Sequence, residues 1–173
     1  MTRIILPTST LTRPNNTTAY AQNDLIADNT TAGSIVVPSL SVDPRHQEIE
    51  LIGGTLYTNL TTGFTTFQGH IDLWDAAPTF SNGDNGAYAV ATGAANWLGH
   101  LTTEVSSAYN AFGDGAKLAA TPGASFTATG SMPIPLRRVS GGLIYWSLRE
   151  IDATGFTPIA NQTFTLALAL CLN

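Results

Sequence analysis

The clearest pattern in the chain is a strict alternation of large and small residues near the C-terminus, from Thr163 to Leu172. Phenylalanine and leucines fall on one side of this segment, and threonines, alanines and Cys171 fall on the other. A period of two is typical of a β-strand, because successive side chains leave the pleated backbone in opposite directions. We expect the leucine side to be buried in a core. The side with small residues is expected to lie against a second layer or another subunit.

Turns rich in Gly, Pro and Asn separate several other segments that have strand character. These segments predict a short strand near Ile4–Leu6 and four further strands, two short and two longer. In residues 47–59, the pair Gly53-Gly54 predicts a bulge or a sharp bend, since two glycines weaken a straight strand. The short strand candidates are 24–27 and 34–37, the second closed by Pro38, and the longer ones are 47–59 and 64–74.

Residues 143–151 are also predicted to form a strand, with Ile144, Trp146 and Leu148 pointing inward and the residues between them pointing outward. In 64–74 the alternation separates an apolar face from a face that carries His70, Asp72 and Trp74. A short helical turn fits only between residues 88 and 99. Many short strands without amphipathic helices predict an all-β, single-domain β-sandwich. We expect an extended arm over residues 1–23 and the sandwich domain over residues 24–173.

Composition agrees with this fold and excludes several classes of partner. Charged residues make up 11% of the 173 residues, and the net charge is −5 without any basic run. Binding to nucleic acid or to an acidic membrane surface is therefore not expected. The apolar C-terminal run is too short to span a bilayer as a helix. Cys171 is the only cysteine, so no intrachain disulfide forms.

Few residues of the sequence are candidates for catalysis or for binding a metal ion or a cofactor. His70 and Asp72 share a strand face and raise the question of a metal or acid–base pair, but no third ligand stands at a metal-like spacing in the sequence. A polar face or subunit contact is the favoured interpretation of that pair. The loop Asn82–Gly86 has the composition of a turn and lacks the ligand pattern of a calcium loop. Phosphate-binding and nucleophile-elbow motifs are absent, so we expect neither an enzyme nor a cofactor.

Three stretches of the chain form a recognisable pattern: Thr12–Tyr20 followed by Asp24; Phe67–Trp74 followed by Ala76–Pro78 and Asp84-Asn85; and Tyr145–Glu150 followed by Phe156–Pro158 and Thr163–Leu166. In this order they resemble a family of small structural proteins of tailed-bacteriophage virions. The resemblance covers most of the chain except residues 99–131, and Gln68-Gly69 stands where the family carries a basic residue before its His-like position. It implies a jelly-roll-like sandwich that decorates and cements a capsid, commonly as a homotrimer, with the major capsid protein as partner and the outer capsid surface as location.

Two sets of residues are candidates for contact with partners. A pair between Arg13 and Asp24 would pin the N-terminal arm to the sandwich, because a guanidinium can hold a carboxylate through two hydrogen bonds; two unrelated surface charges are the alternative. Exposed aromatic rings can stack on sugars, which makes a glycan- or receptor-binding component of a tail fibre or head fibre the alternative function. Capsid or subunit contact is predicted for Arg13, Pro14, Tyr20, Asp24, Ala167 and Ala169, and glycan contact for Trp74, His70 and Asp72.

Overall fold

The computed structural model describes residues 3–43, 45, 49–59, 67–103, 110–112, 115–122, 134–136 and 141–172. Within these residues the chain forms β-strands and two short 3-10 turns, η1 (Ala32–Ser34) and η2 (Ala94–Asn96). The strands are β1 (Arg3–Ile5), β2 (Thr8–Thr12), β3 (Leu25–Ile26), β4 (Ser39–Ser41), β5 (Ile49–Thr58), β6 (Gly69–Trp74), β7 (Thr79–Phe80), β8 (Val90–Thr92), β9 (Trp97–Thr103), β10 (Asn110–Phe112), β11 (Gly115–Pro122), β12 (Ile134–Leu136), β13 (Leu143–Glu150) and β14 (Thr163–Leu172). Parts of the predicted segments, at 47–48, 64–66 and within 99–131, lie outside the described residues.

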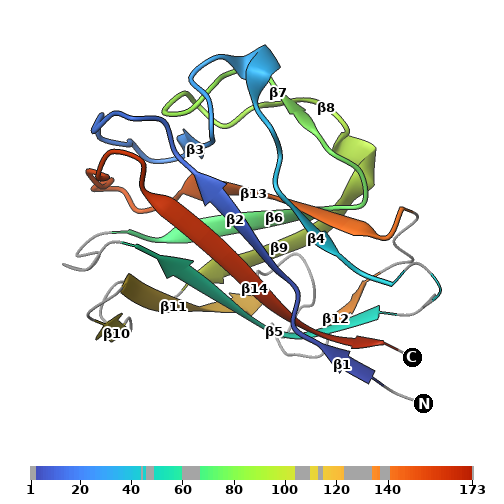
Figure 1. Cartoon of the computed structure of the whole chain (residues 1–173). Helices are drawn as coiled ribbons and strands as arrows, with labels where there is room; N and C mark the ends of the chain where they lie inside the picture. The colour runs from blue at the N-terminus through green and yellow to red at the C-terminus, as the bar shows by residue number, and fades with distance from the viewer. Residues whose placement is uncertain are drawn as a thin grey trace.

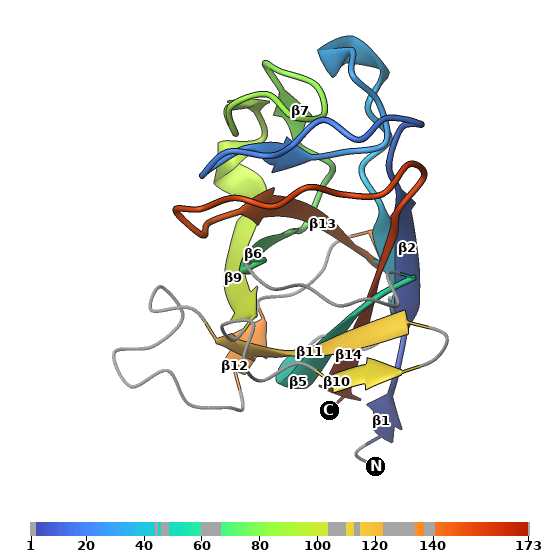
Figure 2. The same cartoon turned by 90° about the vertical axis from the view of Figure 1, so that its left-hand side faces the viewer.

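One twelve-stranded antiparallel sheet folds over on itself to make two layers. Its order is β1-β14-β5-β11-β9-β6-β13-β3, with β2 beside β14, β4 beside β13, and β10 and β12 beside β11 and β5. Figure 2 shows the layer with β9 and β6 on the left of the molecule and β2 on the right. The all-β sandwich that the sequence predicts is confirmed.

The C-terminal strand β14 lies at the centre of one layer, hydrogen-bonded to β5 along one edge and to β2 and β1 along the other. Its large residues, from Phe164 to Leu172, are all completely buried, and its small residues are half-buried on the outer face. The boundaries and the two faces predicted from the alternation are therefore confirmed. In Figure 1 β14 is the red strand that runs diagonally beside β2.

The predicted irregularity at Gly53-Gly54 is a β-bulge. Gly53 pairs with Ala169 and Leu51 pairs with Leu170, so Ile52 between them is an extra residue without a partner on β14. The bulge turns Ile52 to the outside, where 36% of its surface is exposed. It thereby allows Leu51 and Leu56, an odd number of positions apart, both to be buried on the inner face.

The predicted strand at 34–37 is wrong. Residues 32–34 form the turn η1, and the strand begins only after Pro38, as β4 beside β13. Ile35 and Val37 pack instead against a small second core that contains Leu25 and Phe80, while Val36 between them is exposed. The predicted helical turn within 88–99 is the short η2, which Gly93 precedes in a left-handed conformation.

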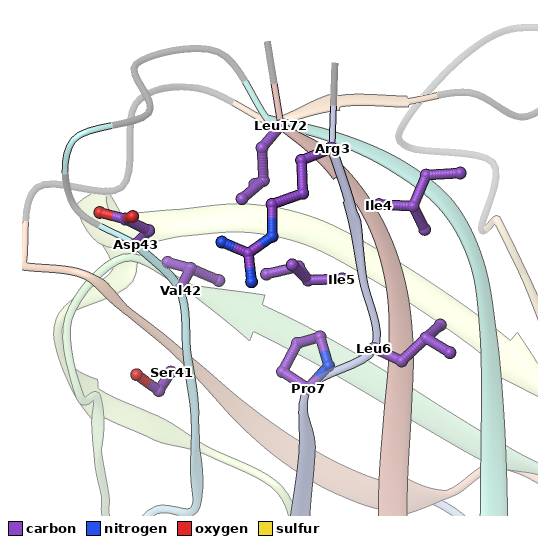
Figure 3. Close-up of a pocket in the computed structure, with 9 residues that line it drawn as sticks. All are labelled: Arg3, Ile4, Ile5, Leu6, Pro7, Ser41, Val42, Asp43 and Leu172. Carbon is purple, nitrogen blue, oxygen red and sulfur yellow. The ribbon is translucent and has the colours of Figure 1, made fainter. Parts of the chain in front are cut away.

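The N-terminal arm is extended, and it is also part of the sheet. Residues 8–12 pair with β14, and Leu11 is buried in the main core. At the N-terminal end, Arg3, Ile5 and Pro7 face Val42 and Asp43 across a groove, as Figure 3 shows. Ile4 and Leu6 point away from this groove and are 62% and 71% exposed. Asp43 forms an ion pair with Arg45, with Nη2 and Oδ2 2.7 Å apart.

Candidate functional site

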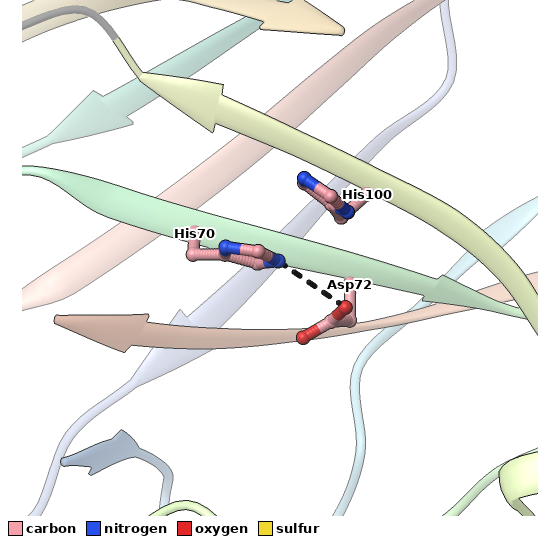
Figure 4. A group of neighbouring side chains, drawn as sticks. All are labelled: His70, Asp72 and His100. Atoms are coloured by element: carbon pink, nitrogen blue, oxygen red, sulfur yellow. Dashed lines mark ion pairs between the residues drawn. The ribbon is translucent and has the colours of Figure 1, made fainter. Parts of the chain in front are cut away.

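Most of the polar chemistry of the described residues gathers on the outer face of β9, β6 and β13. These three strands are neighbours, with β6 in the middle, and their alternation directs His70 and Asp72 of β6 to the same side. Asp72 lies opposite His100 on β9, and His70 lies opposite Arg149 on β13. Figure 4 shows His100 of β9 beside the two residues of β6. We call His70, Asp72 and His100 the histidine–aspartate cluster.

The histidine rings of the cluster stack, with ring centroids 4.0 Å apart. Trp97 continues the stack, 6.0 Å from the His100 ring, and its indole N–H donates a 2.9 Å hydrogen bond to Asp72 Oδ1. His70 Nε2 lies 3.4 Å from the same oxygen. On the β13 side, Arg149 Nη2 lies 3.3 Å from His70 Nε2. His70 is thus held between a neutral ring and a guanidinium.

Burial and these contacts set the protonation states of the cluster. Burial lowers the pKa of His100 to about 4, with His70 adding to the effect, so His100 is neutral at pH 7. For Asp72, burial raises the pKa, but the hydrogen bond and charge of His70 outweigh it, and the pKa lies below its ordinary value. Asp72 is therefore an ionised carboxylate that is only 5% exposed.

A cover of aromatic and hydroxyl groups closes one side of the cluster. Tyr88 OH lies 2.9 Å from Ser147 Oγ, and the indole N–H of Trp74 donates to the same hydroxyl at 3.1 Å. The Arg149 guanidinium stands over the Tyr88 ring at 4.8 Å. Burial and then the nearby Asp72 carboxylate raise the pKa of Tyr88, so it stays a neutral phenol. Ser147 lies on the face opposite Trp146, as predicted, but these rings bury it.

The sequence-based interpretation of this face was correct in part. His70 and Asp72 do lie together, but the sequence spacing did not reveal a third possible ligand, His100, which the pairing of β9 with β6 brings beside them. Trp74, proposed as the glycan-contacting tryptophan, is 3% exposed and hydrogen-bonded to Ser147, whereas Trp97 is 41% exposed. Alternation within one strand cannot reveal His100 or Trp97, because their position depends on how β9 pairs with β6.

A second polar cluster is buried within the fold and joins the N-terminal segment to the loop 82–86. Arg13 Nη2 and Asp84 Oδ2 form a 3.0 Å ion pair with both side chains fully buried. The Tyr20 hydroxyl bridges the two, accepting from Arg13 Nε and donating to Asp84 Oδ1. Asp84 Oδ1 also accepts a 3.0 Å hydrogen bond from the backbone N–H of Ala27.

This cluster corrects the predicted Arg13–Asp24 pair. Arg13 binds Asp84, while Asp24 Oδ2 accepts the backbone N–H of Ala21 in a local turn. Tyr20 is buried, and its ring stacks on that of Phe156 with centroids 5.0 Å apart. Because Arg13 and Tyr20 are only 1% and 3% exposed, they stabilise the fold and do not form a contact surface.

The remaining predicted contact residues lie nearer the surface. Pro14 and Asp24 are half-buried beside the buried ion pair, and Ala167 and Ala169 are half-buried on the outer face of β14. The loop Asn82–Gly86 is a turn whose Asp84 is committed to Arg13, which leaves it no calcium-loop role. Gly83 is required there, since a Cβ atom would lie 2.0 Å from the carbonyl oxygen of Thr30.

Comparisons with known proteins do not assign this chain to a family. No protein-family model matches the chain, and no curated protein is similar to it. Among solved structures, the structure of infectious bursal disease virus Gx strain is similar at a TM-score of 0.35 and 11% identity, over 98% of this chain and 37% of that chain. A likeness at this TM-score carries no argument about fold or function. Among the described residues, no helix is long and apolar enough to cross a membrane.

Proposed function

We propose that this protein is a non-enzymatic structural protein of a virus particle, which binds the outer surface of the capsid as an oligomer and stabilises the shell. The sequence resemblance to bacteriophage virion proteins suggests the class, with the major capsid protein as partner and a homotrimer as the oligomer. The observation that carries the proposal is the outer face of β2, β14 and β5, which we call the threonine face.

The threonine face consists mainly of small side chains in register, with Tyr57 of β5 beside Thr165 and the bulge residue Ile52 as its larger apolar members. Thr10 pairs with Thr165 and their hydroxyls lie 2.7 Å apart, and Ala167 lies between Thr8 and Thr55. Over these three strands Glu50, at one end, is the one charged residue that shares this face. Such a face loses little side-chain entropy when it is covered, because few long side chains become ordered.

Binding through the threonine face suits a decoration protein, because an oligomer makes the same contact with the capsid several times. Each subunit of an oligomer would bring one copy to the capsid lattice, so modest contacts add up to strong retention. Ile4 and Ile52 lie at the same end of the face and are exposed, which adds apolar area to the proposed contact.

Replacing Ala167 with Arg tests this proposal. The new side chain projects from the middle of the threonine face, so we expect a folded protein with a melting temperature close to that of the unchanged protein. Binding to purified capsids should fall by about tenfold or more, since a charge would be buried without a partner. Co-sedimentation measures binding to capsids, and thermal unfolding measures the melting temperature. Ala91→Arg, on the exposed strand β8, is the control; equal loss in both variants would contradict the proposal.

The alternative function, glycan binding by a fibre component, is favoured by one observation. The Trp97 ring is exposed beside the His100 ring and is held in place by its hydrogen bond to Asp72. A fixed exposed indole is a surface on which a sugar ring can stack. If this function is correct, a glycan array shows specific binding that Trp97→Ala abolishes and that the buried-indole variant Trp74→Phe retains. A blank array with tight capsid binding favours the decoration role.

A further inference from the structure

We propose that His70, Asp72 and His100 form a binding site for one divalent transition-metal ion, with Zn²⁺ as the best match. The inference is independent of the virion role. It rests on the geometry of the cluster and on an unsatisfied oxygen of Asp72.

The spacing of the three side chains fits a single ion. Each residue offers one ligand atom, and these atoms all lie within 4.8 Å of one another. His70 Nε2 and Asp72 Oδ1 are 3.4 Å apart. Two ligands at about 2.1 Å from a tetrahedral zinc are separated by about 3.4 Å, so this pair already has the required spacing. The ligand atom of His100, which lies above the pair in Figure 4, is within 4.8 Å of both, so a movement of this ring towards the pair would complete a three-ligand site.

Asp72 provides the second, independent observation. Its carboxylate is 5% exposed, and its Oδ2 atom accepts no hydrogen bond within the described part of the chain. The nearest cationic nitrogen, Nε of Arg149, lies 3.9 Å from Oδ2, beyond hydrogen-bond distance. A buried carboxylate oxygen that accepts no hydrogen bond and has only a distant ion pair with Arg149 is costly, and a metal ion is one of the few groups that offset this cost.

The donor set decides the class of ion. Two imidazole nitrogens and one carboxylate oxygen suit zinc and its transition-metal neighbours, whereas magnesium and calcium take oxygen ligands almost exclusively. The indole N–H of Trp97, bound to Asp72 Oδ1, would orient the carboxylate from outside the ligand set.

Arg149 is the group that competes with the ion. Its guanidinium lies beside both His70 and Asp72, and a positive charge at this distance disfavours a dication. Its side chain is 26% exposed, so it has room to turn towards solvent. Replacing Arg149 with a neutral residue is therefore expected to strengthen binding of the metal ion, although it removes a polar contact of His70 and Asp72.

Isothermal titration of the full chain with ZnCl₂ tests the site. We expect one zinc per chain, a Kd weakened by about tenfold or more in His100→Ala, and a Kd tightened by about tenfold in Arg149→Gln. His46→Ala removes a histidine outside the described residues and is the matched control, which should bind like the unchanged protein. Circular dichroism establishes that each variant is folded; Asp72→Asn adds a third ligand test if it folds.

Co²⁺ provides a second readout, because its visible absorption reports the coordination of the bound ion. Absence of stoichiometric zinc binding by the unchanged protein would overturn the proposal. So would unaltered binding in folded His100→Ala, or loss of binding in His46→Ala, which would place the ligands elsewhere.

Discussion

Replacing Asp84 with Asn is expected to destabilise the protein by about 3–5 kcal/mol, the usual cost of removing one partner of a buried ion pair. The Arg13 guanidinium, which has no access to solvent, would lose its only counter-ion among the described residues. Arg13→Met should have a similar effect, because it leaves the Asp84 carboxylate buried with hydrogen bonds only from Tyr20 and Ala27. Urea denaturation measures both changes in the free energy of unfolding.

The double variant Arg13→Met/Asp84→Asn separates the interaction from the individual substitutions. We expect its cost to be at least about 2 kcal/mol less than the sum of the two single costs, since neither group is then left as an unpaired charge. Arg45→Met is the matched control, because it breaks an Arg–Asp pair of similar length whose arginine side chain is 86% exposed. No measurable change is expected there. Strict additivity of the two buried substitutions would contradict the account of the cluster.

The stability of the protein is expected to fall as the pH rises from about 4.5 to about 7, because of Glu150. This side chain is completely buried, and burial raises its pKa from 4.5 to about 7 despite hydrogen bonds from the backbone N–H groups of Gln68 and Asp152. In this window the folded state keeps a proton that the unfolded state releases. Folding is thereby penalised by roughly 3 kcal/mol above pH 7, and the penalty disappears below pH 4.5.

Glu150→Gln isolates this effect, because glutamine keeps the Oε1 acceptor and carries no charge at any pH. The variant should equal the unchanged protein near pH 4 and exceed its stability by roughly 3 kcal/mol at pH 8.5. Measuring unfolding of both proteins across the range gives the difference, in which the titration of other groups cancels. Glu50→Gln, at a half-exposed position on β5, is the control. A difference that does not change with pH would show that the pKa of Glu150 is the same in the folded and unfolded states, which would contradict the raised pKa.

Local patterns in the sequence predict those parts of the fold that depend on alternation and turn chemistry. The strand at 163–172, its buried leucine side and the bulge near Gly53 follow from residues within a few positions of one another. The same reasoning fails at Ile35–Val37, where β-branched residues pack as an irregular segment over a small core. Burial there depends on Phe80, which no local pattern connects with these residues.

The candidate site depends on strand pairing over long distances, and the sequence therefore predicts it only in part. His70 and Asp72 share a strand, so their proximity can be predicted from the period of two. His100 joins them because β6 and β9 pair in one particular register across the excursion formed by residues 75–96. In the same way, Arg13 meets Asp84 only because the N-terminal segment passes beside the loop 82–86.

We propose that the protein binds the outside of a capsid through its threonine face. Cryo-electron microscopy of purified virions that contain the protein, compared with virions prepared without it, tests this proposal most directly. We expect a difference density on the outer shell into which the sandwich fits with β2, β14 and β5 against a capsid subunit or a second copy of the chain. Identical maps, or a density in which this face is turned to solvent, would contradict it.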